Sequence, residues 1–261
     1  MAKKKVKPIS AVTAIIFGII ALALMGVFVV YLLSSGGEGE VSDISIDQSF
    51  EESSLEPPPE SVEVKETMAD AEVGDAVVFG SYEQDGKQGS AEPIEWIVLE
   101  KQEDRLLLIS RYCLDTVSYN DERSTVEWAD SSLYAWLNGE FLNNAFSADE
   151  ASSVLENGGA RASMLSAEEA LKYYEYDSWR VAAATDYAVS KGARVQDGKS
   201  WWWLTDAGEI EGSASYIHFD GTIRKQGFAV DYNLVAVRPV IWVSADTETE
   251  EISETASEIS E

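Results

Sequence analysis

Apolar residues dominate the first part of the chain, and residues 9–33 contain no charged residue at all. A helix of these 25 residues would be about 37 Å long, whereas the hydrocarbon core of a bilayer is about 30 Å thick. A cleaved signal peptide would have a shorter apolar core, of about 7–15 residues, and a small-residue cleavage site behind it. The pattern therefore predicts one uncleaved transmembrane helix, the signal-anchor, over 9–33. The four lysines before it should lie on the cytoplasmic side.

Alternation of apolar and polar residues, which is typical of strands, begins at about residue 73. An antiparallel meander is predicted from three apolar segments, at 73–80, 93–99 and 105–114. More strands are predicted towards the C-terminus, at 200–205, 214–219, 222–230 and 235–243. Asp220-Gly221 is a strong hairpin signal between two of them.

Helical spacing of apolar residues replaces this alternation in the middle of the chain, from residue 133 to residue 141. Two capping boxes follow, Ser147 with Glu150 and Ser166 with Glu169. In each, the serine oxygen can accept the N3 amide while the glutamate reaches back to the cap amide, so short helices should begin there. Because the helices are grouped between two sets of strands, the predicted fold class is α+β, an antiparallel sheet with short helices in the middle.

Composition separates the folded part of the chain from its flanks. Residues 34–71 are rich in acid and serine and poor in large apolar residues, and the C-terminal tail is similar. Such segments bury too little apolar area to offset the entropy lost on ordering. The predicted organisation is a basic tail, a membrane helix, a disordered acidic stalk, a globular domain and a disordered acidic tail, at 1–8, 9–33, 34–71, 72–243 and 244–261.

Charge is distributed as unevenly as hydrophobicity. Four of the 19 basic residues precede the apolar run and all 47 acidic residues follow it, so the part after the run has a net charge of −32. A surface of this sign repels phosphate, which excludes a nucleic-acid partner. Two interpretations of the acidity stay open. The surface captures cations or basic ligands, or it is a solvated, exported surface that resists aggregation.

Few residues could carry catalysis. Cys113, the one cysteine, lies in an apolar segment, and His218, the one histidine, lies in a predicted strand without a Gly-x-Ser-x-Gly elbow. One residue of each kind excludes a Cys/His metal site. Glu92-Pro93 resembles the start of a lectin calcium loop, but Ile94 lacks the oxygen expected next. We therefore expect no enzyme, cofactor or metal, with an uncharacterised hydrolase and calcium-dependent sugar binding as lesser alternatives.

Three consecutive tryptophans give the clearest candidate for a binding site. Strand alternation puts Trp201 and Trp203 on one face and Trp202 on the other. A partly exposed tryptophan beside an acid would suit stacking on a sugar or peptide, so Trp202, Asp206 and Arg238 are the candidate ligand-binding residues. The alternative is that all three tryptophans pack in the core and that Arg238 is a buried structural arginine.

Several short motifs follow one another along the chain in a characteristic order: Trp136-Leu137-Asn138, Ala145-Phe146-Ser147, Leu165-Ser166-Ala167-Glu168-Glu169-Ala170, Trp202-Trp203-Leu204 and Val237-Arg238-Pro239. Residues 73–243 thereby resemble an uncharacterised domain family common in exported proteins of gut Firmicutes. That family is distantly similar to C-type-lectin-like and formylglycine-generating-enzyme-like domains, which implies a lectin-like fold. Residues 205–208 depart from the Arg-Ser-Pro-Gly that follows the tryptophans in the family. The oxidation chemistry of the formylglycine enzymes is excluded, because it needs a cysteine pair.

These observations together predict a protein of the cell membrane whose N-terminus is cytoplasmic and whose C-terminal domain is extracytoplasmic. The domain is expected to be a non-catalytic, lectin-like binding module for a glycan or for a protein or peptide of the envelope. The alternative is a structural or regulatory component of a cell-envelope complex.

Overall fold

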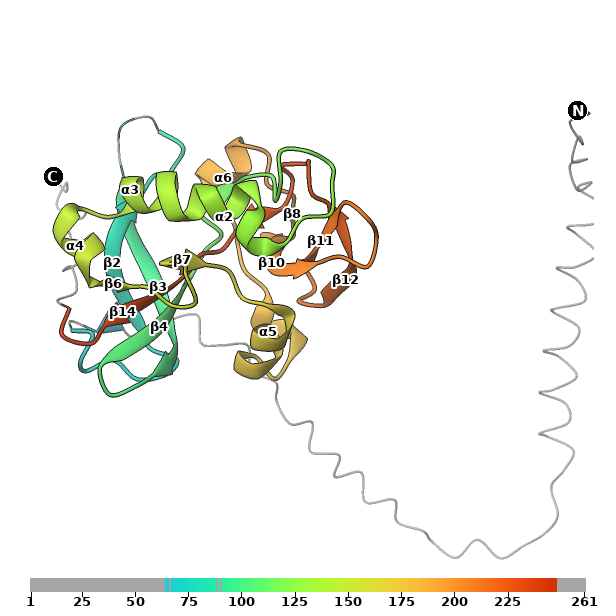
Figure 1. Cartoon of the computed structure of the whole chain (residues 1–261). Helices are drawn as coiled ribbons and strands as arrows, with labels where there is room; N and C mark the ends of the chain where they lie inside the picture. Colours follow the sequence, from blue (N-terminus) through green and yellow to red (C-terminus); the bar gives the residue numbers. More distant parts are fainter. Residues whose placement is uncertain (1–63, 66, 88, 90, 248–261) are drawn as a thin grey trace, which may run out of the picture. The chain divides into compact units, whose positions relative to one another are not determined.

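The computed structural model describes residues 64–65, 67–87, 89 and 91–247 (Figure 1). Its strands are β1 (Val64–Lys65), β2 (Ala76–Tyr82), β3 (Glu92–Lys101), β4 (Arg105–Ser110), β5 (Asp115–Thr116), β6 (Val154–Leu155), β7 (Ala162–Ser163), β8 (Val195–Gln196), β9 (Lys199–Ser200), β10 (Trp202–Ala207), β11 (Ser213–Ile217), β12 (Ile223–Ala229), β13 (Ala236–Val237) and β14 (Val240–Ser244). Its helices are η1 (Trp128–Asp130), α2 (Ser132–Trp136), η2 (Leu137–Phe141), α3 (Leu142–Ala145), α4 (Ala148–Ser153), α5 (Ala167–Tyr173), η3 (Asp177–Arg180) and α6 (Asp186–Ser190).

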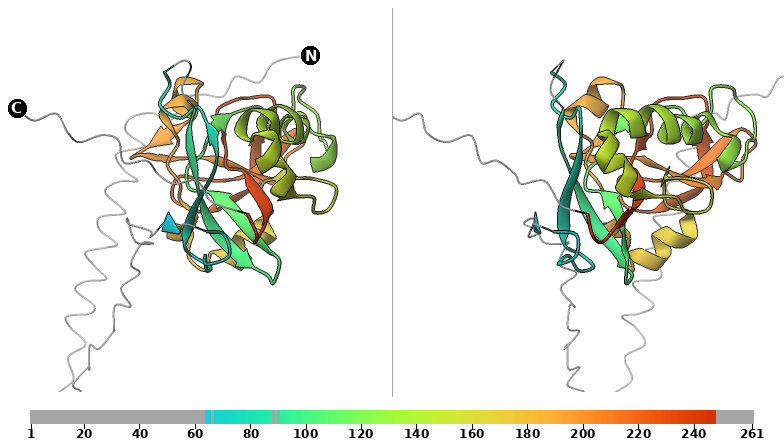
Figure 2. Two further views of the ribbon diagram at one scale, coloured as in Figure 1. Left: turned by 90° about the vertical axis from the view of Figure 1, so that its left-hand side faces the viewer. Right: turned by 60° about the vertical axis from the view of Figure 1, so that its left-hand side comes forward.

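A seven-stranded sheet has the order β1-β2-β3-β4-β14-β6, with β7 also paired to β14. The pairings of β2 with β3 and of β3 with β4 are antiparallel, which confirms the expected meander. The C-terminal strand β14 then returns to lie antiparallel to β4, so the sheet joins segments from both ends of the domain. Figures 1 and 2 show this strand, in red, beside the green strands of the meander.

The second sheet has five strands, in the order β12-β11-β10-β13-β5. Strands β11 and β12 form the hairpin that Asp220-Gly221 predicts, and Gly221 has a φ of +82°, which suits glycine. The amide of His218 donates to the carbonyl of Thr222 across this turn, at 3.0 Å. Strand β10 pairs antiparallel with β11 but parallel with β13, so the sheet is mixed.

Both faces of these sheets are covered by apolar side chains. On one side, Phe79 and Trp96 of the seven-stranded sheet share a cluster with Phe141 of the helical run and with Trp203. On the other side, a second cluster joins side chains of both sheets to the short helices α5 and α6; it includes Leu107, Ile109, Ala170, Ala188 and Trp202. Strand β10, which carries Trp202 and Trp203, therefore packs against an apolar cluster on each of its two faces.

All helices of the described residues are short, the longest being α5 with seven residues. Both predicted capping boxes are present, at Ser147 with Glu150 and at Ser166 with Glu169. Each helix nevertheless ends within about two turns, because glycines or extended residues follow it. Gly139 lies within η2, a π-helical turn that joins α2 directly to α3, so these three short elements form one helical run over residues 132–145.

The predicted α+β class is therefore wrong. The structure is mostly β-sheet with a few short helices, and a lectin-like antiparallel architecture does not describe its mixed sheets. Capping motifs mark where a helix begins but not how far it extends, and here they open helices of only six or seven residues.

Strand β2 is tied to the helical side of the domain by a local irregularity. Its register with β3 shifts between Val78 and Ser81, and Gly80 in this bulge has a φ of +69°. The Gly80 amide donates to Oε1 of Glu150 at 3.1 Å, while Oε2 of the same carboxylate completes the capping box of α4. One glutamate thus joins a helix start to a sheet bulge.

The predicted transmembrane segment 9–33 and most of the predicted stalk and tail lie outside the described residues. None of the helices within 64–247 is long and apolar enough to cross a membrane. Met68 and Ala71 are fully buried, and β1 pairs parallel with β2. The fold therefore includes residues before position 72, where composition places the start of the domain.

Candidate functional site

The three residues that the sequence suggests for ligand binding occupy different environments. Trp202 is fully buried, Arg238 is 5% exposed and Asp206 is half-buried. The carboxylate of Asp206 accepts the amide of Ala167 at 2.6 Å, which places it at the first residue of α5. Trp202 and Arg238 do meet, since the guanidinium carbon lies 5.2 Å from the centre of the indole ring.

The surroundings of Trp202 are those of a core residue. Its indole N–H donates to the carbonyl of Arg180 at 3.0 Å. The Nε of Arg238 donates to the carbonyl of Ser110 at 2.9 Å, and among the described residues no carboxylate pairs with this guanidinium. A ligand could reach Trp202 only if the packing around it opened. The binding role assigned to these residues stays a prediction, and the structure favours the packing alternative.

An open hollow lies beside the first of the three tryptophans, at the edge of the five-stranded sheet. Its volume is about 660 Å³. It is lined by residues of β11, β12 and the segments around them: Trp201, Glu209, Tyr216, His218, Ile223, Arg224, Lys225, Gln226 and Gly227. The hairpin β11–β12 positions most of these side chains, since five consecutive residues of β12, 223–227, line the hollow together with Tyr216 of β11. We call this feature the Trp201 hollow.

The floor of the Trp201 hollow is aromatic. The ring centre of Trp201 lies 4.9 Å from that of Tyr216, 5.3 Å from that of His218 and 5.6 Å from that of Phe228. Trp201 and Tyr216 are 7% and 8% exposed, so the cluster holds them firmly and offers only part of each ring to a ligand. Rings fixed in this way lose little entropy on binding.

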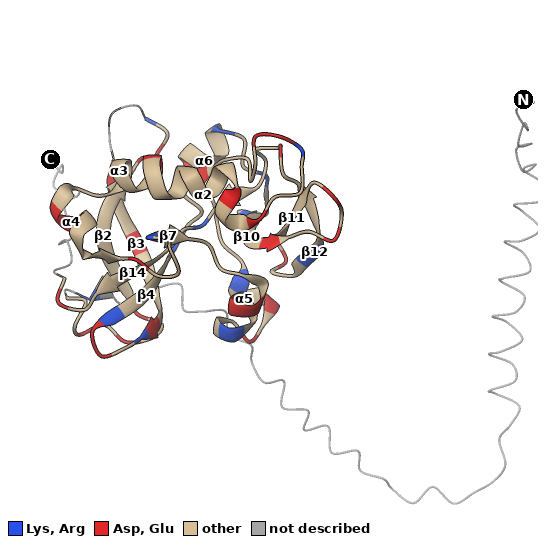
Figure 3. Cartoon of the chain, in the orientation of Figure 1, with Lys and Arg blue, Asp and Glu red and all other residues tan. Residues whose placement is uncertain are grey.

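The rim of the hollow is basic, in contrast to the rest of the chain. Arg224 and Lys225 line it and are exposed, and the guanidinium carbon of Arg194 lies 4.7 Å from the ring centre of Trp201. Figure 3 shows the blue positions on β12, whereas red positions are spread over many loops and helices of the domain. Burial raises the pKa of Tyr216, and the cations of Arg224 and Arg194 act against that increase.

Two nitrogen atoms next to the hollow are buried without a hydrogen-bond partner. They are Nε1 of Trp201 and Nδ1 of His218. The latter lies 3.0 Å from Oδ1 of Asp220, in a contact that is not aligned as a hydrogen bond. Because buried polar groups are nearly always paired, an unpaired indole N–H under an open hollow is a feature that a ligand or water could satisfy.

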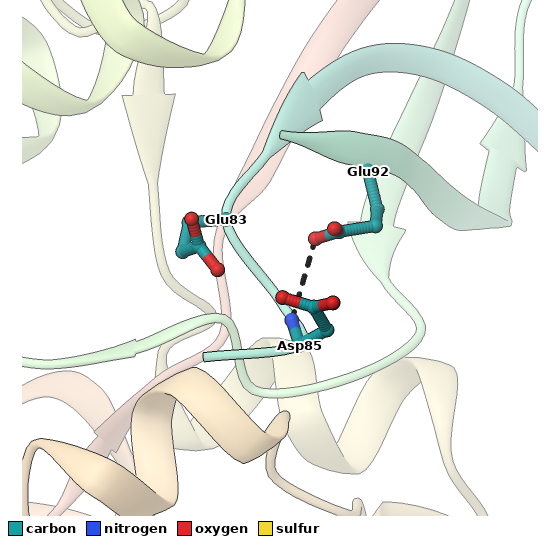
Figure 4. A group of neighbouring side chains, drawn as sticks. All are labelled: Glu83, Asp85 and Glu92. Atoms are coloured by element: carbon teal, nitrogen blue, oxygen red, sulfur yellow. Dashed lines mark hydrogen bonds between the residues drawn. The ribbon is translucent and has the colours of Figure 1, made fainter. Parts of the chain in front are cut away.

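A second group of polar residues lies in the loop between β2 and β3. Oxygen atoms of Glu83, Asp85 and Glu92 lie within 4.8 Å of one another (Figure 4). Burial and the neighbouring carboxylates raise the pKa of Glu83. Glu92 accepts the amides of Gln84 and Asp85, at 2.7 and 3.3 Å, and Asp85 pairs with Lys87. Calcium prefers six to eight oxygen ligands, and here internal donors already engage two of the three carboxylates.

A buried ionic network lies at the same end of β2, around its last residue, Tyr82. Asp115 is 1% exposed and accepts the hydroxyl of Tyr82 at 2.7 Å and the amide of Thr116 at 2.6 Å. Nζ of Lys191 lies 2.8 Å from its Oδ1. Burial and the Asp115 charge raise the pKa of Tyr82 well above its usual value. All of these partners belong to the domain itself, so the network joins β2, β5 and α6, and we interpret it as structural.

The residues best suited to catalysis are not assembled for it. Burial raises the pKa of the Cys113 thiol to about 12, so it stays protonated at neutral pH. The partners described for the imidazole of His218 are Asp220 and the rings of Trp201, Tyr216 and Phe219, and no hydroxyl or thiol nucleophile is among them.

The sequence pattern singles out Trp202, whereas the tryptophan that lines the open hollow is Trp201, and the basic rim was not predicted. Trp201 precedes β10, where both faces of the strand are covered, and it is the one that borders the hollow. A signal was present, since Arg224-Lys225 is an adjacent basic pair in a strongly acidic chain. The grouping of Glu83, Asp85 and Glu92 had no sequence signal, because a hairpin loop brings them together.

Comparison with known proteins gives one match. A family described as a domain of unknown function (DUF6273) matches residues 103–158, a segment that runs from β4 through α4 to β6. No curated protein and no solved structure matches the chain, so nothing links it to lectin-like or formylglycine-generating-enzyme-like folds. The Trp201 hollow lies outside the matched segment. The chain thus contains, at residues 103–158, a domain of an uncharacterised family, DUF6273.

Proposed function

We propose that this domain is a non-catalytic binding module for a saccharide and that the Trp201 hollow is its site. The observation that carries the proposal is the combination of an aromatic floor with a polar rim in one open hollow of about 660 Å³. Sugars present apolar C–H faces and many hydroxyl groups, so they suit a site in which aromatic rings lie beside side-chain donors and acceptors.

The polar groups of the rim support this choice. Glu209 and Gln226 supply acceptors, and Arg224, Lys225 and Gln226 supply donors, all on exposed side chains. Exposed rim residues around a rigid floor would bind hydroxyl groups without first breaking the core. The absence of a nucleophile beside His218 in the described part of the chain supports binding rather than turnover.

The location expected from the sequence is part of the proposal: the cell membrane, with this domain outside the cytoplasm. Proteolysis of intact cells should remove the domain, whereas a cytoplasmic reporter protein should survive the same treatment. Protection of the domain until the cells are lysed would contradict this location.

Titration of the purified full chain with a panel of neutral and acidic oligosaccharides tests the binding proposal. In ¹H–¹⁵N spectra the eight tryptophans give indole signals, and a Trp201→Phe variant assigns one of them. We expect the Trp201 signal to shift with ligand while that of Trp96 stays in place, because its N–H is bonded to the carbonyl of Phe79 at 2.7 Å inside the core. A panel without binding, or binding that leaves the Trp201 signal unmoved, would contradict the proposal.

A further inference from the structure

We infer that the Trp201 hollow selects acidic saccharides, those with a carboxylate on the sugar ring, over neutral ones. The inference rests on the proposed function and adds the chemical class of the ligand. It comes from the charge of the rim and from the way in which its cations are paired.

Cations gather here although acids far outnumber bases in the chain, 47 to 19. Arg224 and Lys225 line the hollow together with a single acid, Glu209, and Arg194 lies over the ring of Trp201. Around this hollow the local sign is opposite to that of the protein as a whole. An anionic ligand repelled by the acidic surface would therefore be attracted to this hollow.

The three cations also lack strong carboxylate partners within the described residues. Arg194 contacts an aromatic ring, and Lys225 has no ionic partner there. Arg224 lies 3.3 Å from Asp220 in a pair whose two side chains are 46% and 49% exposed. Exposed pairs of this kind are weak, so the guanidinium can turn to a ligand carboxylate and bind it with two parallel hydrogen bonds.

Asp220 keeps its negative charge beside the rim, so Arg194, Arg224 and Lys225 face two carboxylates, those of Glu209 and Asp220, and one of the three positive charges remains in excess. Its Oδ1 accepts both the hydroxyl of Thr222 at 2.6 Å and the amide of Thr222 at 3.0 Å. Partial burial alone would raise its pKa, but these hydrogen bonds and His218 lower it to about 2. Asp220 is thus a fixed acceptor of the hairpin turn, and the donors of the rim remain for a ligand.

The floor of the hollow also contains one unpaired donor, beside the hydroxyl of Tyr216 and the imidazole of His218. Nε1 of Trp201 is buried without a partner, and an indole N–H can only donate. The positive edges of aromatic rings likewise favour a negatively charged oxygen over an aliphatic or cationic group. Floor and rim thus favour the same ligand chemistry, a saccharide that carries a carboxylate.

The test compares trigalacturonic acid with its methyl ester, which keeps the rings and hydroxyl groups and removes the charge. Calorimetric titration of the full chain should give at least about tenfold tighter binding for the acid, because hydrogen bonds to charged groups are roughly twice as strong as neutral ones. R224Q and K225Q should each weaken binding of the acid several-fold. The control K101Q, a change of equal charge on β3, should leave it unchanged.

The outcomes separate this inference from the proposed function. Equal binding of acid and ester, with the Trp201 signal shifting, would overturn the inference and leave the saccharide site in place. Equal weakening by K101Q would also overturn it, because only net charge would then matter. If a hexaglutamate peptide binds as tightly as the sugar acid and displaces it, the hollow recognises acidic peptides instead. If none of the three probes binds, the inference fails, and the neutral oligosaccharides of the panel decide the proposed function alone.

Discussion

Replacing Trp202 by phenylalanine would decide whether this residue is part of the core or part of a ligand site. The sequence gives Trp202 as a candidate ligand-binding residue with core packing as the alternative, and the structure buries the ring completely and bonds its N–H to the carbonyl of Arg180. Phenylalanine keeps an aromatic ring in the same place and removes the N–H and one ring. We expect a loss of stability without a change in ligand binding.

The size of that loss follows from two contributions. Truncating a buried tryptophan to alanine costs about 3–5 kcal/mol, so the smaller change to phenylalanine should cost about 1–2 kcal/mol in packing. Leaving the buried carbonyl of Arg180 without its donor adds about 1 kcal/mol. The contact between Arg238 and the smaller ring also weakens, since tryptophan is the best partner for a cation. We therefore expect a loss of about 2–3 kcal/mol in all.

Urea denaturation followed by far-UV circular dichroism measures this loss. The midpoint should fall at an unchanged m-value, because the same surface is exposed on unfolding. In a thermal scan, the loss corresponds to a decrease in Tm of about 4–12 °C for a domain of this size. A loss below about 0.5 kcal/mol would contradict the packing described here. Unchanged stability with weakened oligosaccharide binding would restore Trp202 to the ligand site.

Three further variants test other parts of the fold. Tyr82→Phe removes the hydroxyl that donates to buried Asp115, and since hydrogen bonds to charged groups contribute about 1.5–3 kcal/mol, urea denaturation should show a loss of that size. Hydrogen bonds from Lys172 above all lower the pKa of Glu100 to about 2, so this contribution to stability is present above about pH 4.5 and lost as the pH falls towards 2. Lys172→Met should therefore flatten the decrease in Tm over that range, and parallel curves for the two proteins would refute the pairing. Gly80→Ala places a Cβ 2.5 Å from a backbone oxygen at a positive φ, so it should cost at least about 1 kcal/mol, and an unchanged midpoint would show that the bulge can relax.

Local features of this fold were predictable where a short segment determines them. The capping boxes at Ser147 and Ser166 and the hairpin at Asp220-Gly221 depend on residues no more than three positions apart, and all three are present. The meander of β2, β3 and β4 was predictable for the same reason, since consecutive apolar segments with short polar turns pair with their neighbours.

Features that depend on distant pairings were not predictable from local pattern. The return of β14 to the edge of β4 and the parallel pairing of β10 with β13 join segments far apart in sequence. The parallel pairs β1–β2 and β10–β13 make both sheets mixed, where an antiparallel sheet was expected. The choice among the three tryptophans also depends on distant packing. Alternation correctly separates Trp202 from Trp201 and Trp203, but it does not say whether one or both faces are covered.

Coverage of both faces limits where a ligand can bind to this domain. Many residues of the two large sheets belong to one or the other of two apolar clusters, so the faces of these sheets are largely covered within the described residues. The Trp201 hollow lies instead at an edge, where β12 is the outer strand of the five-stranded sheet. The Trp201 hollow lies along this strand and takes its two basic residues from it. Trp201 directly precedes β10, and its ring centre lies 4.9 Å from that of Tyr216 on β11 and 5.6 Å from that of Phe228 on β12. Trp201 therefore lines the hollow, and it, rather than the fully buried Trp202, is the residue that a ligand there would meet.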